Sequence, residues 1–158
     1  MTEKDGRADF DFFVGTWKVH NRRLKERLKG STTWEEFGGT TVMRKILGGL
    51  GNIEEFTLER ETGPVYGMTL RFFKPESGQW HIYLANSASG LDTQPAIGEF
   101  KDGRGEFYSQ EYFEGRSIFC RVIWSETTTS ACQWEQAFST DGGKTWETNW
   151  ITTFERIA

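Results

Sequence analysis

Five polar side chains stand within segments that are otherwise rich in apolar and aromatic residues, and together they could recognise a small molecule. Arg23 and Arg71 could pair with an acidic group, His81 and Tyr83 are neutral hydrogen-bonding partners, and Asn21 offers an amide. Small-molecule pockets combine mostly apolar walls with a few polar groups of this kind. If these side chains face one interior, they predict a binding site; the other interpretation is the ordinary polar outer face of a sheet.

A carboxyl group beside an arginine or a tyrosine would add proton-transfer chemistry. Glu54 or Glu135, together with Arg71 or Tyr83, could act as general acid or base if their faces converge in a dry pocket. This combination keeps open the alternative of a small enzyme that works without a cofactor. Beyond it, the sequence assigns no catalytic residue.

Motifs for metal binding and for nucleophilic catalysis are absent from the sequence. His20 and His81 are the only histidines, Cys120 and Cys132 are the only cysteines, and none has the spacing of a zinc site. No Gly-x-Ser-x-Gly elbow or phosphate-binding glycine loop follows a predicted strand. We therefore expect no metal, no cofactor and two reduced thiols that pack as small apolar groups.

The charge balance argues against nucleic acid as a partner. The formal net charge is -4 and the sequence pI is ≈ 5.3, whereas domains that bind nucleic acid carry a basic footprint. A short basic run is either a solvated face or an anion-attracting rim at a cavity mouth. It consists of Arg22, Arg23, Lys25, Arg27 and Lys29, opposed only by Glu26.

Targeting signals are also missing from the sequence. The residues from Met1 to Gly6 contain no apolar signal core, and no stretch approaches the length of a membrane span. These features predict a cytoplasmic protein without membrane insertion. The sequence leaves open whether the protein forms a homo-oligomer.

The elements that position these side chains are predicted to be strands. Aromatic residues make up 15% of the chain, and 18 glycines but only 3 prolines suit frequent turns between strands. A short apolar piece at Asp9–Val14 could form a helical turn before them, and Leu24–Leu28 fits either a helix or a strand. The segments Gly38–Gly39 and Gly48–Gly51 are interpreted as turns. The expected strands are Thr16–Arg23, Trp34–Phe37, Thr40–Leu47, Asn52–Arg60, Val65–Lys74, Gln79–Asn86, Ala96–Lys101, Gly105–Phe113, Arg116–Ser125, Ser130–Ser139 and Thr145–Glu155.

Short and even connections between consecutive strands favour a closed barrel over a sandwich, which would need long crossing connections. A share of roughly 60% extended residues is unusual for an ordinary domain, but a barrel accommodates it because closure removes the sheet edges. We therefore predict one all-β domain over residues 1–158. Its fold is a single closed antiparallel up-and-down barrel of about eight to ten strands, with a short N-terminal helical turn.

The segment Phe13-Val14-Gly15-Thr16-Trp17-Lys18 resembles the opening of the calycin superfamily, which includes lipocalins and fatty-acid-binding proteins. The resemblance implies that Trp17, after Gly15, plugs one barrel end and that Arg156 packs on it. The segments 11–17, 141–146 and 149–156 are also similar to a bacterial family of unknown function with a lipocalin-like fold. Haem-carrying relatives, the nitrobindins, use a late proximal histidine, and no histidine follows His81.

The segment Ser139–Trp146 matches the Asp-box pattern Ser-x-Asp-x-Gly-x-Thr-Trp, which resembles a repeated motif of sialidases and other β-propellers. The chain holds one copy, so we expect a hairpin brace and no sialidase activity. Asp141 is expected to cap its own turn, with Trp146 packed underneath.

Three functions fit this sequence. The first is binding of a small, partly apolar organic ligand inside the barrel, with an acidic group on the ligand as one variant. The second is the enzyme alternative, which for similar barrels means decarboxylase, isomerase or cyclase chemistry. The third is a structural domain with a filled lumen, and the fold alone does not decide among them.

Overall fold

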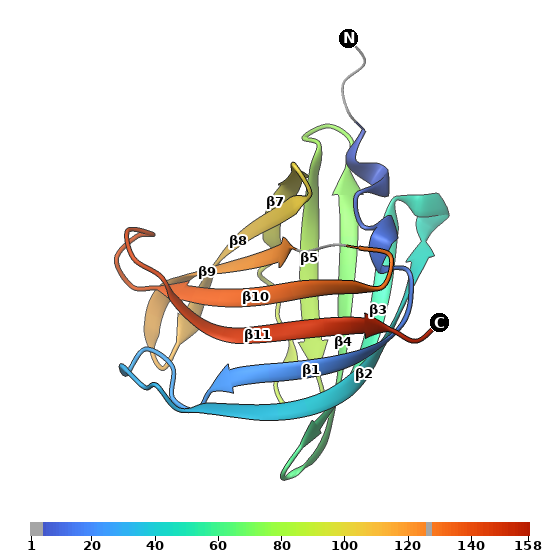
Figure 1. Ribbon diagram of the computed structural model, residues 1–158. Helices are drawn as coiled ribbons and strands as arrows, with labels where there is room; N and C mark the ends of the chain where they lie inside the picture. Colours follow the sequence, from blue (N-terminus) through green and yellow to red (C-terminus); the bar gives the residue numbers. More distant parts are fainter. Residues whose placement is uncertain (1–4, 126–127) are drawn as a thin grey trace.

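The computed structural model describes residues 5–125 and 128–158, and its strands form one antiparallel sheet that closes on itself (Figure 1). Two 3-10 helices, η1 (Gly6–Ala8) and η2 (Asp11–Phe13), precede the first strand, and η3 (Leu47–Gly49) follows the second. Residues 1–4, on which part of the targeting prediction depends, lie outside the described residues. The strands are β1 (Gly15–Leu24), β2 (Trp34–Ile46), β3 (Gly51–Arg60), β4 (Gly63–Lys74), β5 (Gln79–Asn86), β6 (Gly90–Leu91), β7 (Ala96–Lys101), β8 (Arg104–Phe113), β9 (Arg116–Ser125), β10 (Ala131–Ser139) and β11 (Glu147–Arg156).

The pairing of the strands follows the order of the chain. Neighbours in sequence pair from β1 to β5 and from β7 to β11, β5 also pairs with β7, and β1 pairs with β11. Within the described residues, every strand except the two-residue β6 therefore belongs to the closed ring, and β6 pairs only with β5. The prediction of a closed antiparallel up-and-down barrel is confirmed. In Figure 1 the strands β1, β2, β10 and β11 cross the direction of β4 and β5, which is the strand tilt of a small barrel.

Alternation of side chains along β1 sets which residues face the interior. Trp17, Val19 and Asn21 are buried, whereas the intervening Lys18 and His20 are exposed. Because successive side chains of a strand point to opposite faces, this pattern fixes the inward face of β1. The register of β1 with its neighbours then extends the inward face around the barrel.

A tryptophan and an arginine close one end of the barrel, which we call the base. The guanidinium of Arg156 lies 4.2 Å from the centre of the Trp17 ring, and the Trp17 indole donates a hydrogen bond of 3.0 Å to the carbonyl of Phe13. A Cβ atom on Gly15 would stand 2.5 Å from Nη1 of Arg156, so only glycine leaves room for this contact. The guanidinium also donates hydrogen bonds to the carbonyl oxygens of Phe12, Val14 and Thr129.

The interpretation of Gly38–Gly39 as a turn is wrong, because both residues lie within the continuous strand β2. Gly39 pairs with Val19 on one side and with Leu58 on the other. A Cβ atom on Gly39 would stand 2.2 Å from the carbonyl oxygen of Thr57. The glycine therefore marks a close approach of neighbouring strands, where a side chain would collide with the neighbouring backbone.

The ambiguous segment Leu24–Leu28 is neither a helix nor a strand beyond Leu24, where β1 ends. The connection that follows reaches β11, which pairs with β1 on the side opposite β2. There the backbone N–H of Leu28 donates a hydrogen bond of 2.7 Å to Oε1 of Glu147. In Figure 1 this connection lies at the opposite end of β1 from η2. We call this end, with Arg23, the β1–β2 connection and Arg60, the mouth of the barrel.

No helix among the described residues combines the length and the apolar character that crossing a membrane would require. Both cysteines, Cys120 and Cys132, are free and buried. Burial is the main reason that the pKa of each thiol lies above its ordinary value.

Candidate functional site

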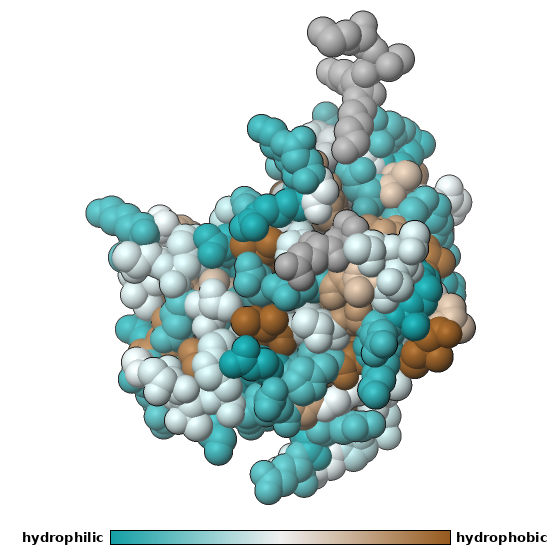
Figure 2. Space-filling model, in the orientation of Figure 1, coloured by the Kyte–Doolittle hydropathy of each residue, from teal (hydrophilic) through white to brown (hydrophobic). Residues whose placement is uncertain are grey.

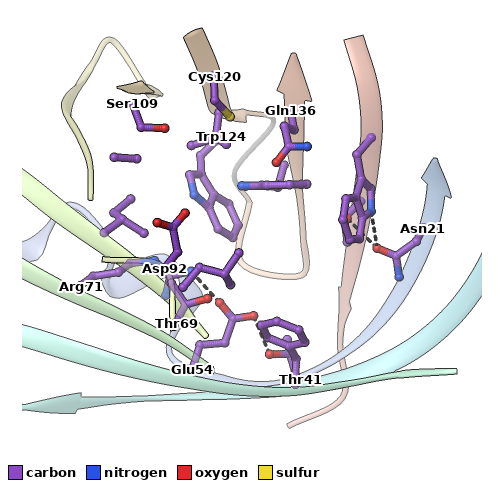
Figure 3. Close-up of a pocket in the computed structure, with 18 of the residues that line it drawn as sticks. Asn21, Thr41, Glu54, Thr69, Arg71, Asp92, Ser109, Cys120, Trp124 and Gln136 are labelled. Carbon is purple, nitrogen blue, oxygen red and sulfur yellow. Dashed lines mark hydrogen bonds and ion pairs between the residues drawn. The ribbon is translucent and has the colours of Figure 1, made fainter. Parts of the chain in front are cut away.

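The face of the molecule seen in Figure 2 is mostly hydrophilic, and its apolar residues form small separate patches. By contrast, a cavity of ≈ 170 Å³ inside the barrel is lined largely by apolar side chains (Figure 3). Its presence shows that side chains do not fill the whole lumen. The apolar lining consists of Val19, Phe56, Leu58, Ile82, Leu84, Ala96, Val122, Trp124, Trp134, Trp150 and Phe154.

Arg71 lines this cavity, and its charge is already paired there. Its Nη2 lies 2.5 Å from Oε1 of Glu54, and its Nη1 donates a hydrogen bond of 3.0 Å to Oδ1 of Asn52. The second oxygen of Glu54 accepts a hydrogen bond of 2.6 Å from the hydroxyl of Thr41 (Figure 3). Only 3% of Arg71 and 5% of Glu54 is exposed to solvent. The pair is a buried, hydrogen-bonded ion pair, and it offers little net charge to a ligand.

Asn21 also lines the cavity, and its amide holds an aromatic wall in place. Its Oδ1 accepts hydrogen bonds from the indole of Trp150 at 3.0 Å and from the hydroxyl of Thr152 at 2.7 Å, as Figure 3 shows for Asn21 and the neighbouring indole. Its Nδ2 donates to the carbonyl of Phe37 at 3.3 Å. Most of its hydrogen-bonding capacity is therefore used within the protein.

Arg23 follows Asn21 by two residues and lies on the same face of β1, at the mouth. Its guanidinium stands 4.9 Å from the centre of the Trp150 ring. Burial, followed by the charges of Arg27 and Arg60, lowers the pKa of Arg23 to about 10. Unlike Arg71, this cation has two other arginines as neighbours, and its ion pair with Glu35 is long, at 3.9 Å.

The alternation along β5 turns His81 and Tyr83 away from the cavity. Ile82 and Leu84 line the cavity, so His81 and Tyr83, at the alternate positions of the strand, point to the outer face. There the Tyr83 ring packs against Phe72, with 6.3 Å between ring centres. Burial and the charge of Lys74 lower the pKa of His81. The sequence could not decide the parity of this strand, and the structure does not bring these two residues to the other site residues.

The two glutamates considered for catalysis lie in different places. Glu54 joins Arg71 in the lumen, but Glu135 does not line the cavity, because its neighbours Trp134 and Gln136 do. Across residues 5–125 and 128–158, no three side chains of His, Cys, Asp or Glu gather in a way that could hold a metal ion.

A polar group that the sequence analysis missed lies on the wall formed by β8, β9 and the segment before β7. It comprises Asp92, Ser109, Glu111 and Cys120, all of which line the cavity. Burial and the neighbouring carboxyl of Asp92 raise the pKa of Glu111, while Ser109 donates a hydrogen bond of 3.3 Å to it. Alternation from the buried Phe107 through 109 to 111 could have pointed to this face, had the parity of β8 been known.

The Asp-box segment forms a braced turn between β10 and β11. One oxygen of Asp141 accepts hydrogen bonds from the backbone of Thr145 and the hydroxyl of Ser139, and the other accepts one from the hydroxyl of Thr145. The Trp146 indole donates a hydrogen bond of 3.1 Å to the carbonyl of Gly143. The hydrogen bonds that Asp141 accepts, chiefly from Thr145 and Ser139, lower its pKa to about 2. All of them are internal to the turn, which is what a structural brace requires.

Comparison with known proteins places the fold but not the family. No protein-family model matches the chain, and no curated protein matches it either. Among solved structures, the chain is similar to the S-type phycobiliprotein lyase CPES from Guillardia theta, with a TM-score of 0.63 and 11% identity over 99% of this chain and 94% of that one. It is also similar to EF1p2_mFAP2b bound to DFHBI, with a TM-score of 0.51 and 10% identity over 96% of this chain and 98% of that one.

Proposed function

We propose that the barrel binds a small, partly apolar organic molecule in its lumen. The observation that carries the proposal is the cavity of ≈ 170 Å³ within the barrel, lined by aromatic and aliphatic side chains with a few polar groups among them. A closed barrel that served only as a structural unit would gain stability from filling this space, because each unfilled volume forfeits packing contacts.

The size of the cavity limits the body of the ligand. An engineered apolar cavity of about 150 Å³ holds a benzene molecule. A cavity of ≈ 170 Å³ therefore suits one aromatic or alicyclic ring, or a short branched chain. A larger ligand would have to extend through the mouth.

The similar structures add support at the level of the fold. EF1p2_mFAP2b is bound to DFHBI, so at least one barrel of this fold holds a small organic molecule. At 10% identity this likeness says nothing about which molecule the present chain takes.

An acidic group on the ligand is part of the proposal, and the two arginines expected to meet it differ in suitability. Arg71 is neutralised by Glu54 at the inner part of the lumen, whereas Arg23 at the mouth has no carboxylate closer than 3.9 Å among the described residues. We therefore assign the acidic group to Arg23, with Asn21 holding the Trp150 wall beside it.

The test is binding of fluorobenzene, followed by ¹⁹F NMR titration, to the wild type and to a pair of matched variants. Val122→Phe places the added ring in the cavity, while Val42→Phe places the same ring on the exposed outer face of β2. Binding by the wild type and by Val42→Phe, with loss in Val122→Phe, supports the proposal. No binding to the wild type at millimolar concentration, or equal binding to both variants, contradicts it.

A second candidate function, proton-transfer catalysis on the bound molecule, has one observation in its favour. Glu111, whose pKa is raised by burial and by Asp92, lines the same cavity as the proposed ligand, and a carboxyl that stays protonated at higher pH can act as a general acid. If a turned-over ligand is found, Glu111→Gln should lower the rate and abolish the descending limb of the pH–rate profile, because a general acid loses activity when it deprotonates. An unchanged profile would reject this role.

A further inference from the structure

Two arginines meet one carboxylate at the mouth of the barrel. Nη2 of Arg60, the last residue of β3, lies 2.6 Å from Oε1 of Glu35, and Nη1 of Arg23 lies 3.9 Å from the same oxygen. Glu35 thus forms a close pair with Arg60 and only a distant one with Arg23. The two guanidiniums and one carboxylate leave a surplus of one positive charge at this place.

A third arginine adds to this positive field. Arg27, on the β1–β2 connection, stands over the rings of Phe113 and Phe138 at 4.8 and 5.4 Å. Its charge is near enough to Arg23 to contribute to lowering the pKa of that guanidinium. Burial lowers the pKa of Arg27, and the charges of Glu111 and Glu114 oppose this shift. Glu114 also pairs with Lys29 at 3.6 Å.

The aromatic rings of the mouth hold Arg23 and Arg60 in defined orientations. Arg60 lies 4.1 Å over the Phe37 ring, Arg23 lies 4.9 Å over the Trp150 ring, and these two rings meet edge to face at 6.1 Å. A guanidinium whose face is covered by a ring still presents its N–H groups in its own plane. These contacts therefore preorganise two planar donors at the mouth. Neither arginine lines the cavity itself, but Arg23 stacks on Trp150, which does.

Arg23 is also under-used within the protein. Its Nε is buried, and in the part of the chain that the structure describes it has no hydrogen-bond partner. About a quarter of the side chain remains exposed, at 23%, and Arg60 is similar at 21%, so both can be reached from solvent. Buried donors without a partner are rare in native proteins, and a bound ion is one of the explanations. The Nε atoms of Arg71 and Arg121 share this feature, so Arg23 is distinguished by its partial exposure and by its long distance to a carboxylate.

We propose that Arg23 and Arg60 form a carboxylate-binding site at the mouth, and that the ligand is a monocyclic carboxylic acid whose ring lies in the lumen. The inference rests on the proposed function, because the ring occupies the same cavity. A planar carboxylate matches the fork of a guanidinium, and one negative charge matches the surplus of one positive charge. Glu35 is then an internal competitor that holds Arg60 in the absence of ligand.

The test compares an acid with its uncharged amide, 4-fluorophenylacetate with 4-fluorophenylacetamide, by ¹⁹F NMR titration. The wild type should bind the acid at least about tenfold more tightly than the amide, as expected for one charge-assisted hydrogen-bonded contact. Arg23→Gln should remove this preference by weakening binding of the acid far more than binding of the amide. Arg44→Gln is the matched control, because Arg44 is an exposed arginine of β2 whose loss changes the net charge equally.

Glu35→Gln gives a variant that tests the site by gain of function. Removing the competing carboxylate should tighten binding of the acid several-fold and change binding of the amide much less, and raising the salt concentration should weaken the acid more than the amide. If the amide binds as tightly as the acid to the wild type, the carboxylate site is rejected while binding in the lumen stands. If neither probe binds, the proposed function fails together with the site. Circular dichroism on each variant separates these outcomes from misfolding.

Discussion

The buried pair of Arg71 and Glu54 should behave as a coupled unit in the stability of the barrel. Arg71→Met alone leaves a carboxylate with 5% exposure that keeps only the hydrogen bond from Thr41. Breaking a buried pair in this way costs about 3–5 kcal/mol, because one charge stays buried without its partner. Glu54→Leu alone leaves the Arg71 guanidinium with Asn52 as its remaining hydrogen-bond partner, and should cost a similar amount. Either loss is a large fraction of the roughly 5–15 kcal/mol that stabilises a typical domain.

The double variant Glu54→Leu/Arg71→Met should be far less destabilised than the sum of the single variants. The guanidinium lies within 5.5 Å of the ring centres of Phe10, Phe13 and Trp124, and methionine can keep contacts with those rings. Replacing a buried ion pair by well-packed apolar residues is often neutral, so we expect a coupling energy of at least about 3 kcal/mol.

Urea denaturation monitored by tryptophan fluorescence measures this coupling, and Trp124 provides a reporter beside the pair. The variant Thr41→Val serves as a control, because it removes the hydroxyl donor to Glu54 without removing a charge and should cost about 1.5–3 kcal/mol, less than either charge removal. If the effects of the two single substitutions add within about 0.5 kcal/mol, the charges are not coupled and the argument for a neutralised inner lumen is wrong.

Three further predictions concern other parts of the barrel. Arg156→Ala should destabilise the fold by about 2–4 kcal/mol, measured by urea denaturation, because three backbone carbonyls and the Trp17 ring lose their partner; a loss below about 0.5 kcal/mol would refute the brace at the base. Gly39→Val should prevent folding or lower the melting temperature sharply, because its Cβ would meet the Thr57 carbonyl at 2.2 Å. Gly103→Ala has no atom within 4 Å of its Cβ and should cost only the strain of its positive φ, about 1–2 kcal/mol. Glu111→Gln should flatten the pH dependence of stability. Because the pKa of Glu111 is raised above 4.5 in the folded state, the folded wild type binds the carboxyl proton more tightly than the unfolded chain does. The wild type therefore loses stability as the pH rises through the folded pKa. Equal slopes for wild type and variant in thermal melts above pH 4.5 would contradict this assignment.

The strands could be predicted from the sequence because local signals determine them. Gln79–Asn86, Ala96–Lys101 and Arg116–Ser125 have the bounds that alternation and flanking turn residues indicate. Gly39 was misinterpreted because the reason for glycine there is the carbonyl of Thr57 on the neighbouring strand, which no local pattern contains. The conformation of residues 25–29 is likewise set by distant partners, such as Glu147 for Leu28.

The candidate site was harder to predict because it depends on the parity and the register of the strands. A shift by one residue exchanges the inner and outer faces of a strand, so His81 and Tyr83 were as plausible as Ile82 and Leu84 until β5 was placed. The pairing of Asn52 with Arg71 across β3 and β4 brings Glu54 within reach of the same guanidinium. Residues 17 positions apart in the chain therefore form one ion pair. The sequence allowed this pair, but it could not distinguish it from the other combinations of Glu54 or Glu135 with Arg71 or Tyr83.

The inner lumen and the mouth differ in net charge, and this difference determines the orientation in which a ligand would bind. The inner arginine has its own carboxylate and two more hydrogen-bonding partners around the pair, so an anionic group placed there would meet a neutral site and lose its hydration without compensation. At the mouth, Arg23 and Arg60 share one carboxylate and remain partly open to water. An amphipathic acid therefore loses least by placing its ring inward against Trp124 and Trp134 and its carboxylate outward at Arg23. The opposite orientation would bury the acid next to Glu54, where the repulsion between two carboxylates in a low-dielectric lumen opposes binding.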